Sequence, residues 1–374
     1  MFWETTAACN LVCSHCRRTE VTDKPSSREL SSEEARSLID ELSEWGRTIL
    51  VLSGGEPLLR PDIFDLMNYA NEKRLVLALA TNGTLIDQNL AARIRRSGVD
   101  RVSVSLDGAD ESTHDAFRRL PGSFRSAVSG IQALRAESVP LQINVTVARH
   151  NAHQLDEMVA LAKSFDAAAL HLFLLVPVGC GMEIAEEQTL QADAYEETLN
   201  WLYETERREV SLQLRATCAP HYFRVVRQRE AVGGDSSEPS AHVPPGHTDL
   251  GGNGSQRGAL HTATRGCLAG TGVCFVSNTG KIYGCGYMPI EAGDLRRTSL
   301  SRIWQTSDFF ADLRDLGRLK GKCGQCGFDR VCGGCRARAY GSTGDYLAEE
   351  PFCAYQPGGR SGAVRLGAPL RAES

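Results

Sequence analysis

The sequence lacks the features that would place the protein in a membrane or on nucleic acid. None of its segments carries 18 consecutive apolar residues, so we expect no membrane-spanning helix. It has no basic excess, because 46 acidic residues face 41 basic ones and the formal net charge is −5, which argues against nucleic acid as a partner. We also expect no signal peptide, since strand-like residues begin at Phe2. We therefore expect a cytoplasmic protein.

Cysteine, by contrast, is abundant, with 13 residues in a chain of 374. An odd number cannot form a complete disulfide framework, and the reducing conditions of the cytoplasm keep thiols free. In that setting clustered cysteines are more often metal ligands or catalytic groups. The positions of the cysteines therefore carry most of the functional argument.

Short strand-like runs alternate with amphipathic, helix-like runs through the first half of the chain. The strand-like runs, rich in Val, Ile, Leu and Thr, are 2–6, 48–53, 75–81, 101–106, 141–147 and 168–176. The clearest helix is predicted at 32–45, because Ser31 and Glu34 match a capping box. This alternation predicts an α/β fold, a partial (β/α)6 barrel of parallel strands. Because the first run begins almost at once, it stays open whether Met1 is the natural start.

The first chemical motif follows the first predicted strand. Cys9, Cys13 and Cys16 have the spacing C-x3-C-x2-C. Three thiolates at this spacing can hold three irons of a cubane iron–sulfur cluster and leave the fourth iron open to another ligand. A zinc site is the alternative, although zinc usually takes four protein ligands.

A second motif, Gly-Gly-Glu-Pro at 54–57, follows the second predicted strand. Together the two motifs strongly resemble those of the radical SAM enzymes. The resemblance implies that the three cysteines hold a [4Fe–4S] cluster whose open iron chelates S-adenosylmethionine (SAM), and that reduction of SAM releases a 5′-deoxyadenosyl radical. It also implies a set of residues close to SAM. These are His15, Gly54, Gly55, Glu56, Asn82, Ser105 and Asp107.

The C-terminal region carries eight further cysteines, which resemble the SPASM extension of radical SAM maturases. The resemblance implies one or two auxiliary [4Fe–4S] clusters. One would be held by Cys267, Cys274, Cys285 and Cys335, and the other by Cys323, Cys326, Cys332 and Cys353. The spacing between Cys332 and Cys335 is C-x2-C, where the extension usually has C-x3-C, and this difference leaves open which cysteines bind which cluster. A zinc ribbon is the alternative to iron–sulfur clusters. Cys180 and Cys218 would remain free thiols.

The domain organisation follows from these motifs. We predict a radical SAM barrel at 1–215 and a connecting region at 216–266 that contains a Gly-, Ser-, Pro- and His-rich loop. A small SPASM-like domain would occupy 267–357, and a disordered tail would occupy 358–374.

Three further segments, at 3–9, 217–222 and 332–353, make the chain most similar to the heme b synthases of the alternative heme pathway. This resemblance implies oxidative decarboxylation of two propionates of Fe-coproporphyrin III to vinyl groups. Related possibilities are a didecarboxysiroheme deacetylase or a heme d1 pathway enzyme. The main alternative is a peptide maturase, although many of those begin with a leader-binding domain that precedes the barrel. A non-enzymatic iron–sulfur scaffold is the remaining alternative.

An iron porphyrin with four propionates would call for cationic partners. Arg17 and Arg18 follow the cysteine motif directly, so we expect them near the substrate. His221 is a further candidate, as a ligand of the heme iron or a partner of a propionate. An external reductant such as flavodoxin or ferredoxin would supply electrons, and an auxiliary cluster would accept the electron released during decarboxylation.

Overall fold

The computed structural model describes residues 1–19, 21–232 and 266–358. Its centre is a ten-stranded sheet in the order β10-β9-β8-β1-β2-β3-β4-β5-β6-β7, and the neighbours from β1 to β7 are parallel. The strands are β1 (Phe2–Glu4), β2 (Ile49–Ser53), β3 (Val76–Thr81), β4 (Arg101–Ser105), β5 (Leu141–Val147), β6 (Ala169–Leu174), β7 (Gln213–Thr217), β8 (Phe275–Val276), β9 (Lys281–Tyr283) and β10 (Glu291–Asp294).

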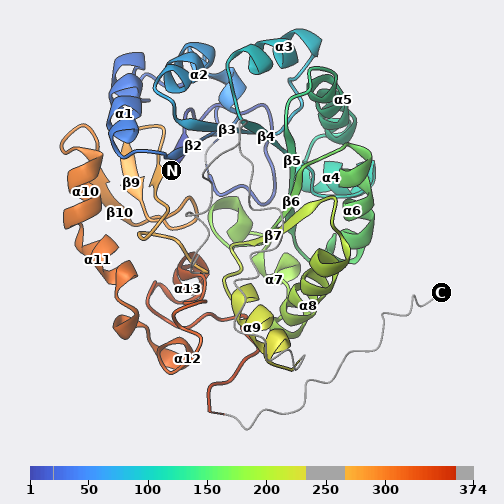
Figure 1. Ribbon diagram of the computed structural model, residues 1–374, viewed down its shortest axis with the longest axis vertical. Coiled ribbons are helices and arrows are strands. Elements are labelled where there is room, and N and C mark those ends of the chain that lie inside the picture. The colour runs from blue at the N-terminus through green and yellow to red at the C-terminus, as the bar shows by residue number, and fades with distance from the viewer. Residues whose placement is uncertain (20, 233–265, 359–374) are drawn as a thin grey trace.

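Helices connect the parallel strands and cover the outer side of the curved sheet (Figure 1). Along the barrel these are α1 (Ser32–Glu44), α2 (Ile63–Glu72), α3 (Gln88–Arg96), α4 (Glu111–Arg118), α5 (Ser123–Ala136), α6 (Leu155–Ser164), α7 (Ala185–Gln188), α8 (Ala192–Arg208) and α9 (Tyr222–Val232). The C-terminal helices are α10 (Leu300–Thr306), α11 (Asp308–Arg314), α12 (Gly321–Gly324) and α13 (Arg336–Thr343). In the part of the chain with described coordinates, no helix combines the length and the apolar character that crossing a membrane requires.

The six strands predicted from the sequence are confirmed as β1 to β6, with ends that differ by two residues or fewer. The capping box is also present, since Ser31 accepts a hydrogen bond from Glu34 N and Glu34 in turn accepts one from Ser31 N. Strand β7 adds a seventh parallel neighbour. Parallel strands are covered on both faces, which explains why side chains such as Leu50, Leu77 and Val102 are fully buried.

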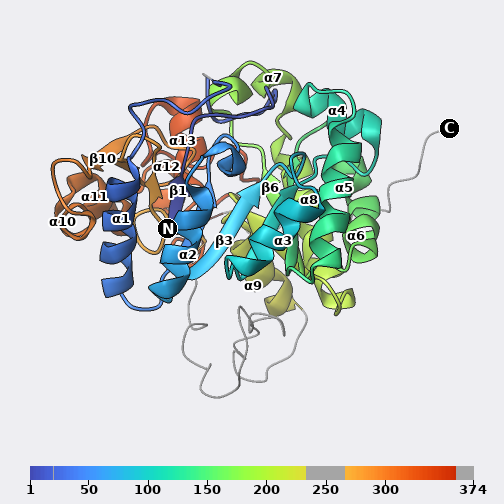
Figure 2. The same ribbon diagram turned by 90° about the horizontal axis from the view of Figure 1, so that it is seen from above.

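The cysteine-rich C-terminal segment joins the same sheet. Strand β8 pairs in parallel with β1, so the sheet continues from the barrel into β9 and β10. Helix α10 contacts α1, and α11 follows it on the same side of the molecule (Figures 1 and 2). Trp45 donates its indole N–H to Ser301 Oγ at 2.7 Å, and its ring packs against Trp304. Most of the predicted loop before this segment, at 233–265, and the tail at 359–374 lie outside the described residues.

The contact between α1 and α10 can be tested through Glu41, whose carboxylate accepts hydrogen bonds from Leu300 N at 2.9 Å and Ser301 N at 2.6 Å. We expect Glu41→Ala to loosen α10, because two backbone donors lose a charged acceptor worth about 1.5–3 kcal/mol per hydrogen bond. Hydrogen exchange followed by mass spectrometry should show faster exchange in α10 and no change in α5. Glu44→Ala, at an exposed position of the same helix, is the matched control. Equal exchange of α10 in both variants would contradict the prediction.

Candidate active site

The three cysteines of the first motif lie in the loop between β1 and α1, at the carboxyl end of the sheet. Glu29 anchors the start of this loop, since its Oε1 accepts hydrogen bonds from Thr6 Oγ1 at 3.0 Å and Ala7 N at 2.7 Å. Cys9 N donates to Thr22 O at 2.8 Å. The loop is therefore held by its own backbone and by a buried carboxylate before any ligand binds.

The glycines after β2 are required by this loop. A Cβ on Gly54 would lie 2.8 Å from Thr6 O, and a Cβ on Gly55 would lie 2.7 Å from Ala7 O and nearer still to Ala8 O. Gly55 N also donates a hydrogen bond to Thr6 O at 2.8 Å. The space that a side chain would occupy is thus filled by the backbone of the cysteine loop, which is why two glycines occur here.

Glu56 is fully buried and holds the next strand in place. Its carboxylate accepts hydrogen bonds from Asn82 N and Thr81 Oγ1, both at 2.8 Å, and from Leu58 N at 3.2 Å. Burial raises the pKa of Glu56 to about 7, although these donors oppose the shift. Asn82 extends the network toward the cysteines, because its Nδ2 donates to Asn10 Oδ1 at 2.9 Å and lies 4.0 Å from Cys9 Sγ. A carboxylate has about four acceptor positions, and these hydrogen bonds use three of those of Glu56.

Asp107 and Arg118 form a buried ion pair beside Cys13. Arg118 Nη2 lies 2.6 Å from Asp107 Oδ2, and Arg118 Nη1 donates to Cys13 Sγ at 3.7 Å. Burial disfavours ionisation of Asp107, but Arg118, His15, His114 and the backbone amide of Thr146 together outweigh it and lower the pKa of that carboxyl to about 2. Asp107 Oδ1 accepts a hydrogen bond from Thr146 N at 2.7 Å. Asp107 therefore supports the cysteine loop through Arg118, a role that its position after β4 does not reveal in the sequence.

His15 lies in a stack of three rings. Its imidazole packs against Phe117 at 4.1 Å between centroids, and Phe117 packs against His150 at 4.0 Å. Burial lowers the pKa of His15 to about 3, so the ring is neutral at pH 7. Its Nε2 lies 3.5 Å from Asp107 Oδ2. Helix α4 supplies Phe117, the ring on which His15 stacks.

Two contacts at the cysteines of the first motif bear on their charge state. Leu11 N donates to Cys9 Sγ at 3.4 Å, and the guanidinium of Arg118 faces Cys13. Both contacts favour thiolates. Among residues 1–19, 21–232 and 266–358, no three Cys, His, Asp or Glu side chains converge on one point as a metal ion requires. The ligands of a cubane cluster bind separate irons, so their sulfurs lie further apart than the ligands of one tetrahedral zinc.

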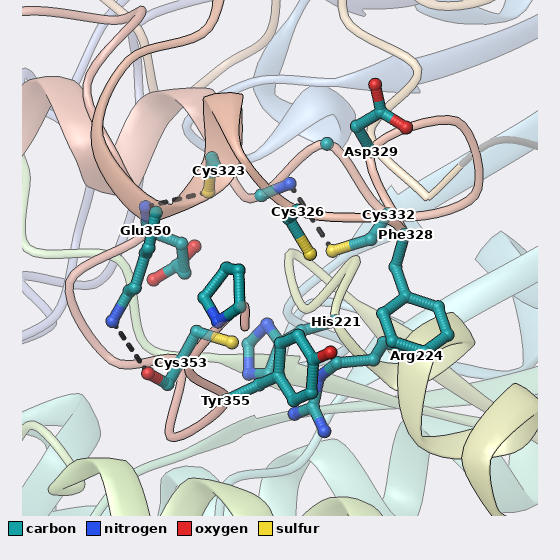
Figure 3. A pocket seen from close by; sticks show the side chains of 14 residues that line it. His221, Arg224, Cys323, Cys326, Phe328, Asp329, Cys332, Glu350, Cys353 and Tyr355 are labelled. Atoms are coloured by element: carbon teal, nitrogen blue, oxygen red, sulfur yellow. Dashed lines mark hydrogen bonds between the residues drawn. The ribbon is translucent and has the colours of Figure 1, made fainter. Parts of the chain in front are cut away.

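A second group of cysteines surrounds a cavity in the C-terminal region (Figure 3). Its members are Cys323, Cys326, Cys332 and Cys353. Backbone amides face two of the sulfurs, with Glu350 N at 3.3 Å from Cys323 Sγ and Gly334 N at 3.4 Å from Cys332 Sγ. Such donors stabilise thiolates, as a cluster ligand requires. These are the four cysteines that the resemblance assigned to the second auxiliary site, and that assignment stays a prediction.

His221 lines this same cavity and is fully buried (Figure 3). Neither of its ring nitrogens has a hydrogen-bond partner within the described residues. Burial lowers the pKa of His221 to about 3. Its position favours a role toward the cavity of the four cysteines and does not support the predicted contact with a substrate.

A third group contains Cys267, Cys285 and Cys335. The thiol of Cys285 lies close enough to those of Cys335 and Cys267 to interact electrostatically, and Cys335 also interacts with Cys267. Burial raises the pKa of Cys335 to about 11. Cys218, which the sequence predicted to be a free thiol, lies with this group.

The sequence predicted that Cys274 would lie with the third group, but the structure places it elsewhere. Its Sγ lies 3.5 Å from Met1 Sδ, and its backbone carbonyl accepts a hydrogen bond from Phe2 N at 3.0 Å. The reason is the pairing of β8 with β1, which places the residue before β8 beside the start of β1. Spacing along the sequence cannot reveal that register.

The predicted substrate residues Arg17 and Arg18 both pair with Glu4 at the end of β1. The distances from Glu4 Oε1 are 2.5 Å to Arg17 Nη2 and 2.6 Å to Arg18 Nη1. Arg17 also lies over the ring of Phe275, 4.4 Å from its centroid. Two guanidinium groups therefore share the carboxylate of Glu4. Ser105, the remaining predicted SAM residue, is partly exposed at the end of β4.

Comparison with known proteins decides the family. Residues 3–162 match the radical SAM superfamily, and residues 267–335 match the SPASM iron-sulfur cluster-binding domain. An AdoMet-dependent heme synthase of Methanosarcina barkeri is 46% identical over 95% of this chain and 96% of its own length. Another AdoMet-dependent heme synthase, from Nitratidesulfovibrio vulgaris, is 42% identical over 95% of this chain and 92% of its own length. The chain belongs to the radical SAM family of AdoMet-dependent heme synthases.

Other radical SAM proteins are more distant. Mycofactocin maturase MftC of Mycobacterium ulcerans is 32% identical over 94% of this chain and 86% of its own length. The crystal structure of Streptococcus suis SuiB bound to its precursor peptide superposes with a TM-score of 0.72 at 15% identity, covering 95% of this chain and 75% of that one. This likeness confirms the fold, a radical SAM partial barrel with a SPASM region. The cofactors of the family are a SAM-binding [4Fe–4S] cluster, SAM and auxiliary iron–sulfur clusters.

The packing between Gly55 and the cysteine loop predicts the effect of Gly55→Ala. The added Cβ would overlap the backbone of Ala7 and Ala8, and overpacking of this kind costs about 1–3 kcal/mol. We expect 5′-deoxyadenosine formation from SAM and dithionite to fall about tenfold or more. Gly272→Ala is the control, since a Cβ there makes only ordinary contacts at 3.7 Å and beyond. Equal rates in the two variants would show that the loop tolerates the overlap.

The ion pair of Arg118 predicts a pH-dependent defect. Arg118→Met leaves the carboxylate of Asp107 buried without its counter-charge, which costs about 3–5 kcal/mol at neutral pH. In the parent, ionised Asp107 contributes stability above its usual pKa of 3.8, and this is lost only as the pH falls toward about 2. In the variant, burial raises that pKa, so protonation relieves the defect as the pH falls.

The melting temperature of the cluster-loaded variant should therefore approach that of the parent between pH 8 and pH 6. Arg119→Met, at the exposed neighbouring position, should match the parent at both values. If the difference in melting temperature between Arg118→Met and the parent stays constant from pH 8 to pH 6, the defect does not have an electrostatic origin.

Proposed function

We propose that this protein makes heme b by oxidative decarboxylation of two propionate side chains of Fe-coproporphyrin III. The observation that carries the proposal is the 46% identity to an AdoMet-dependent heme synthase over nearly the full length of both chains. The three groups of cysteines described above support it, because the reaction needs both a source of radicals and an acceptor of electrons.

With its cluster and SAM bound, the first site supplies a 5′-deoxyadenosyl radical. The residues around it serve to bind and position. Cys9, Cys13 and Cys16 hold the cluster, and the packed glycines and the Arg118–Asp107 pair keep their loop in one conformation. Glu56 has an acceptor position left for the ammonium of SAM. The neutral ring of His15 adds an apolar wall that excludes water.

The corner at Arg17 and Arg18 is the proposed contact for substrate carboxylates. Both residues follow the cysteine loop directly and pair with Glu4 at the end of β1. A guanidinium carries five N–H donors in a planar fork, which suits a propionate carboxylate. Bidentate pairing of a guanidinium with the substrate carboxylate would orient the propionate side chain next to the reacting centre.

The balance of the reaction requires an electron acceptor. Each propionate loses one hydrogen atom from its β-carbon, then CO2 and one electron, and becomes a vinyl group. The two C-terminal groups of cysteines are the proposed holders of that acceptor. We further propose that an external donor such as flavodoxin or ferredoxin reduces the first site. A cytoplasmic setting, whose reducing conditions preserve free thiols, is the proposed location.

Anaerobic incubation of the cluster-loaded enzyme with Fe-coproporphyrin III, SAM and dithionite tests the proposal. We expect a porphyrin product that has lost two units of CO2H2 by mass, with 5′-deoxyadenosine formed alongside. In the double variant Arg17→Ala/Arg18→Ala, the KM for the porphyrin should rise by a larger factor than the factor by which the rate of uncoupled SAM cleavage falls. An unchanged porphyrin in an assay that still yields 5′-deoxyadenosine would favour another substrate, such as a peptide. Absence of 5′-deoxyadenosine from the loaded enzyme would instead remove the radical mechanism.

A further inference from the structure

Cys218 stands directly after β7, the last parallel strand of the barrel, and outside the segment that matches the SPASM domain. Its backbone is in the left-handed region, with φ of 56°, which is rare for a residue that has a side chain. Such a conformation persists only where the surroundings hold it. The direction of this side chain is therefore imposed by tertiary contacts.

The surroundings of Cys218 are thiols. It interacts electrostatically with Cys335, Cys285 and Cys267, which also interact with one another. We propose that Cys218 is the fourth ligand of the auxiliary cluster held by Cys267, Cys285 and Cys335. The inference concerns the cluster alone and holds whichever substrate the enzyme takes.

A single buried ion pair holds two of these four residues. Arg338 Nε lies 2.7 Å from Glu350 Oε1, and both side chains are buried. Arg338 Nη2 donates to Cys218 O at 2.5 Å, while Glu350 Oε2 accepts from Cys335 N at 2.8 Å. The pair therefore fixes a barrel residue and a C-terminal residue relative to each other. This is how two cysteines 117 positions apart in the sequence come to face one site.

Tyr287 relates this group to the first motif. Its hydroxyl interacts electrostatically with Cys218 and Cys285 and also with Cys16. A cluster bound through Cys218 would also link β7 to the C-terminal segment covalently, through iron.

Cys274 is the competing candidate for the fourth ligand. Its thiol lies 3.5 Å from Met1 Sδ and interacts electrostatically with the N-terminal ammonium. Within the described residues no interaction joins it to Cys267, Cys285 or Cys335. Substitution of Cys274 should therefore leave the cluster intact.

The test uses the full chain with Cys9, Cys13 and Cys16 changed to alanine, so that the SAM-binding cluster does not contribute. Cys218→Ala and Cys274→Ala are added separately, and each protein is reconstituted anaerobically with iron and sulfide. A [4Fe–4S] cluster with three thiolates has one exposed iron and loses it on mild oxidation. We expect ferricyanide to release about one iron per chain from the Cys218→Ala protein and to produce a [3Fe–4S] signal by electron paramagnetic resonance.

The Cys274→Ala protein should behave like the parent background. The opposite pattern, with the signal in Cys274→Ala and none in Cys218→Ala, would overturn the proposal. If Cys218→Ala does not fold, Cys218→Ser keeps the size and backbone of the site, and an oxygen ligand should then shift the spectrum of the reduced cluster. A spectrum identical to that of the parent would also overturn the proposal. Neither outcome depends on the porphyrin assay, so a failure of this inference can be told apart from a failure of the proposed function.

Discussion

The rest of the structure depends on the pairing of β1, a strand of three residues, with neighbours on both of its edges. One edge pairs in parallel with β2 and leads into the barrel, and the other pairs in parallel with β8 and leads into the cysteine-rich segment. Trp3 is fully buried between them, and the carboxylate of Glu4 accepts a hydrogen bond from Asn278 N at 3.3 Å. The loop that follows carries the SAM-binding cysteines. The strand thus sets the position of the first site relative to the auxiliary sites.

Buried ion pairs recur beside the cysteines. Arg118–Asp107 supports Cys13, and Arg338–Glu350 supports Cys218 and Cys335. A buried pair gains little stability over apolar packing, but loss of one partner is costly because the other is left as an uncompensated charge. Such pairs suit a site whose geometry must stay fixed while charge moves through it. Both also direct hydrogen-bond donors or positive charge toward thiolates, which stabilises the deprotonated ligands.

Much of the fold and part of the site could be predicted from the sequence. The six strands and the capped helix α1 were visible because buried parallel strands and helix N-termini have strong local patterns. The cysteine loop and the glycines after β2 were recognisable as a motif, although the reason for the glycines was not. They accommodate the backbone of Thr6 to Ala8, which only the folded chain brings against them. The position of Cys274 beside Met1 was hidden for a related reason, since spacing does not encode which strand β8 joins.

The sequence alone determined the chemistry available to this protein, because ligand type and short-range spacing reside in residues close together along the chain. Three thiols within eight residues can hold a cluster with an open iron wherever that loop lies. The tertiary structure alone decided which distant groups complete each site. Arg118 reaches Cys13 from the end of α4, and Cys218 reaches the auxiliary cysteines from the end of β7. These contacts arise from strand order and helix packing, which are long-range properties that no local pattern records.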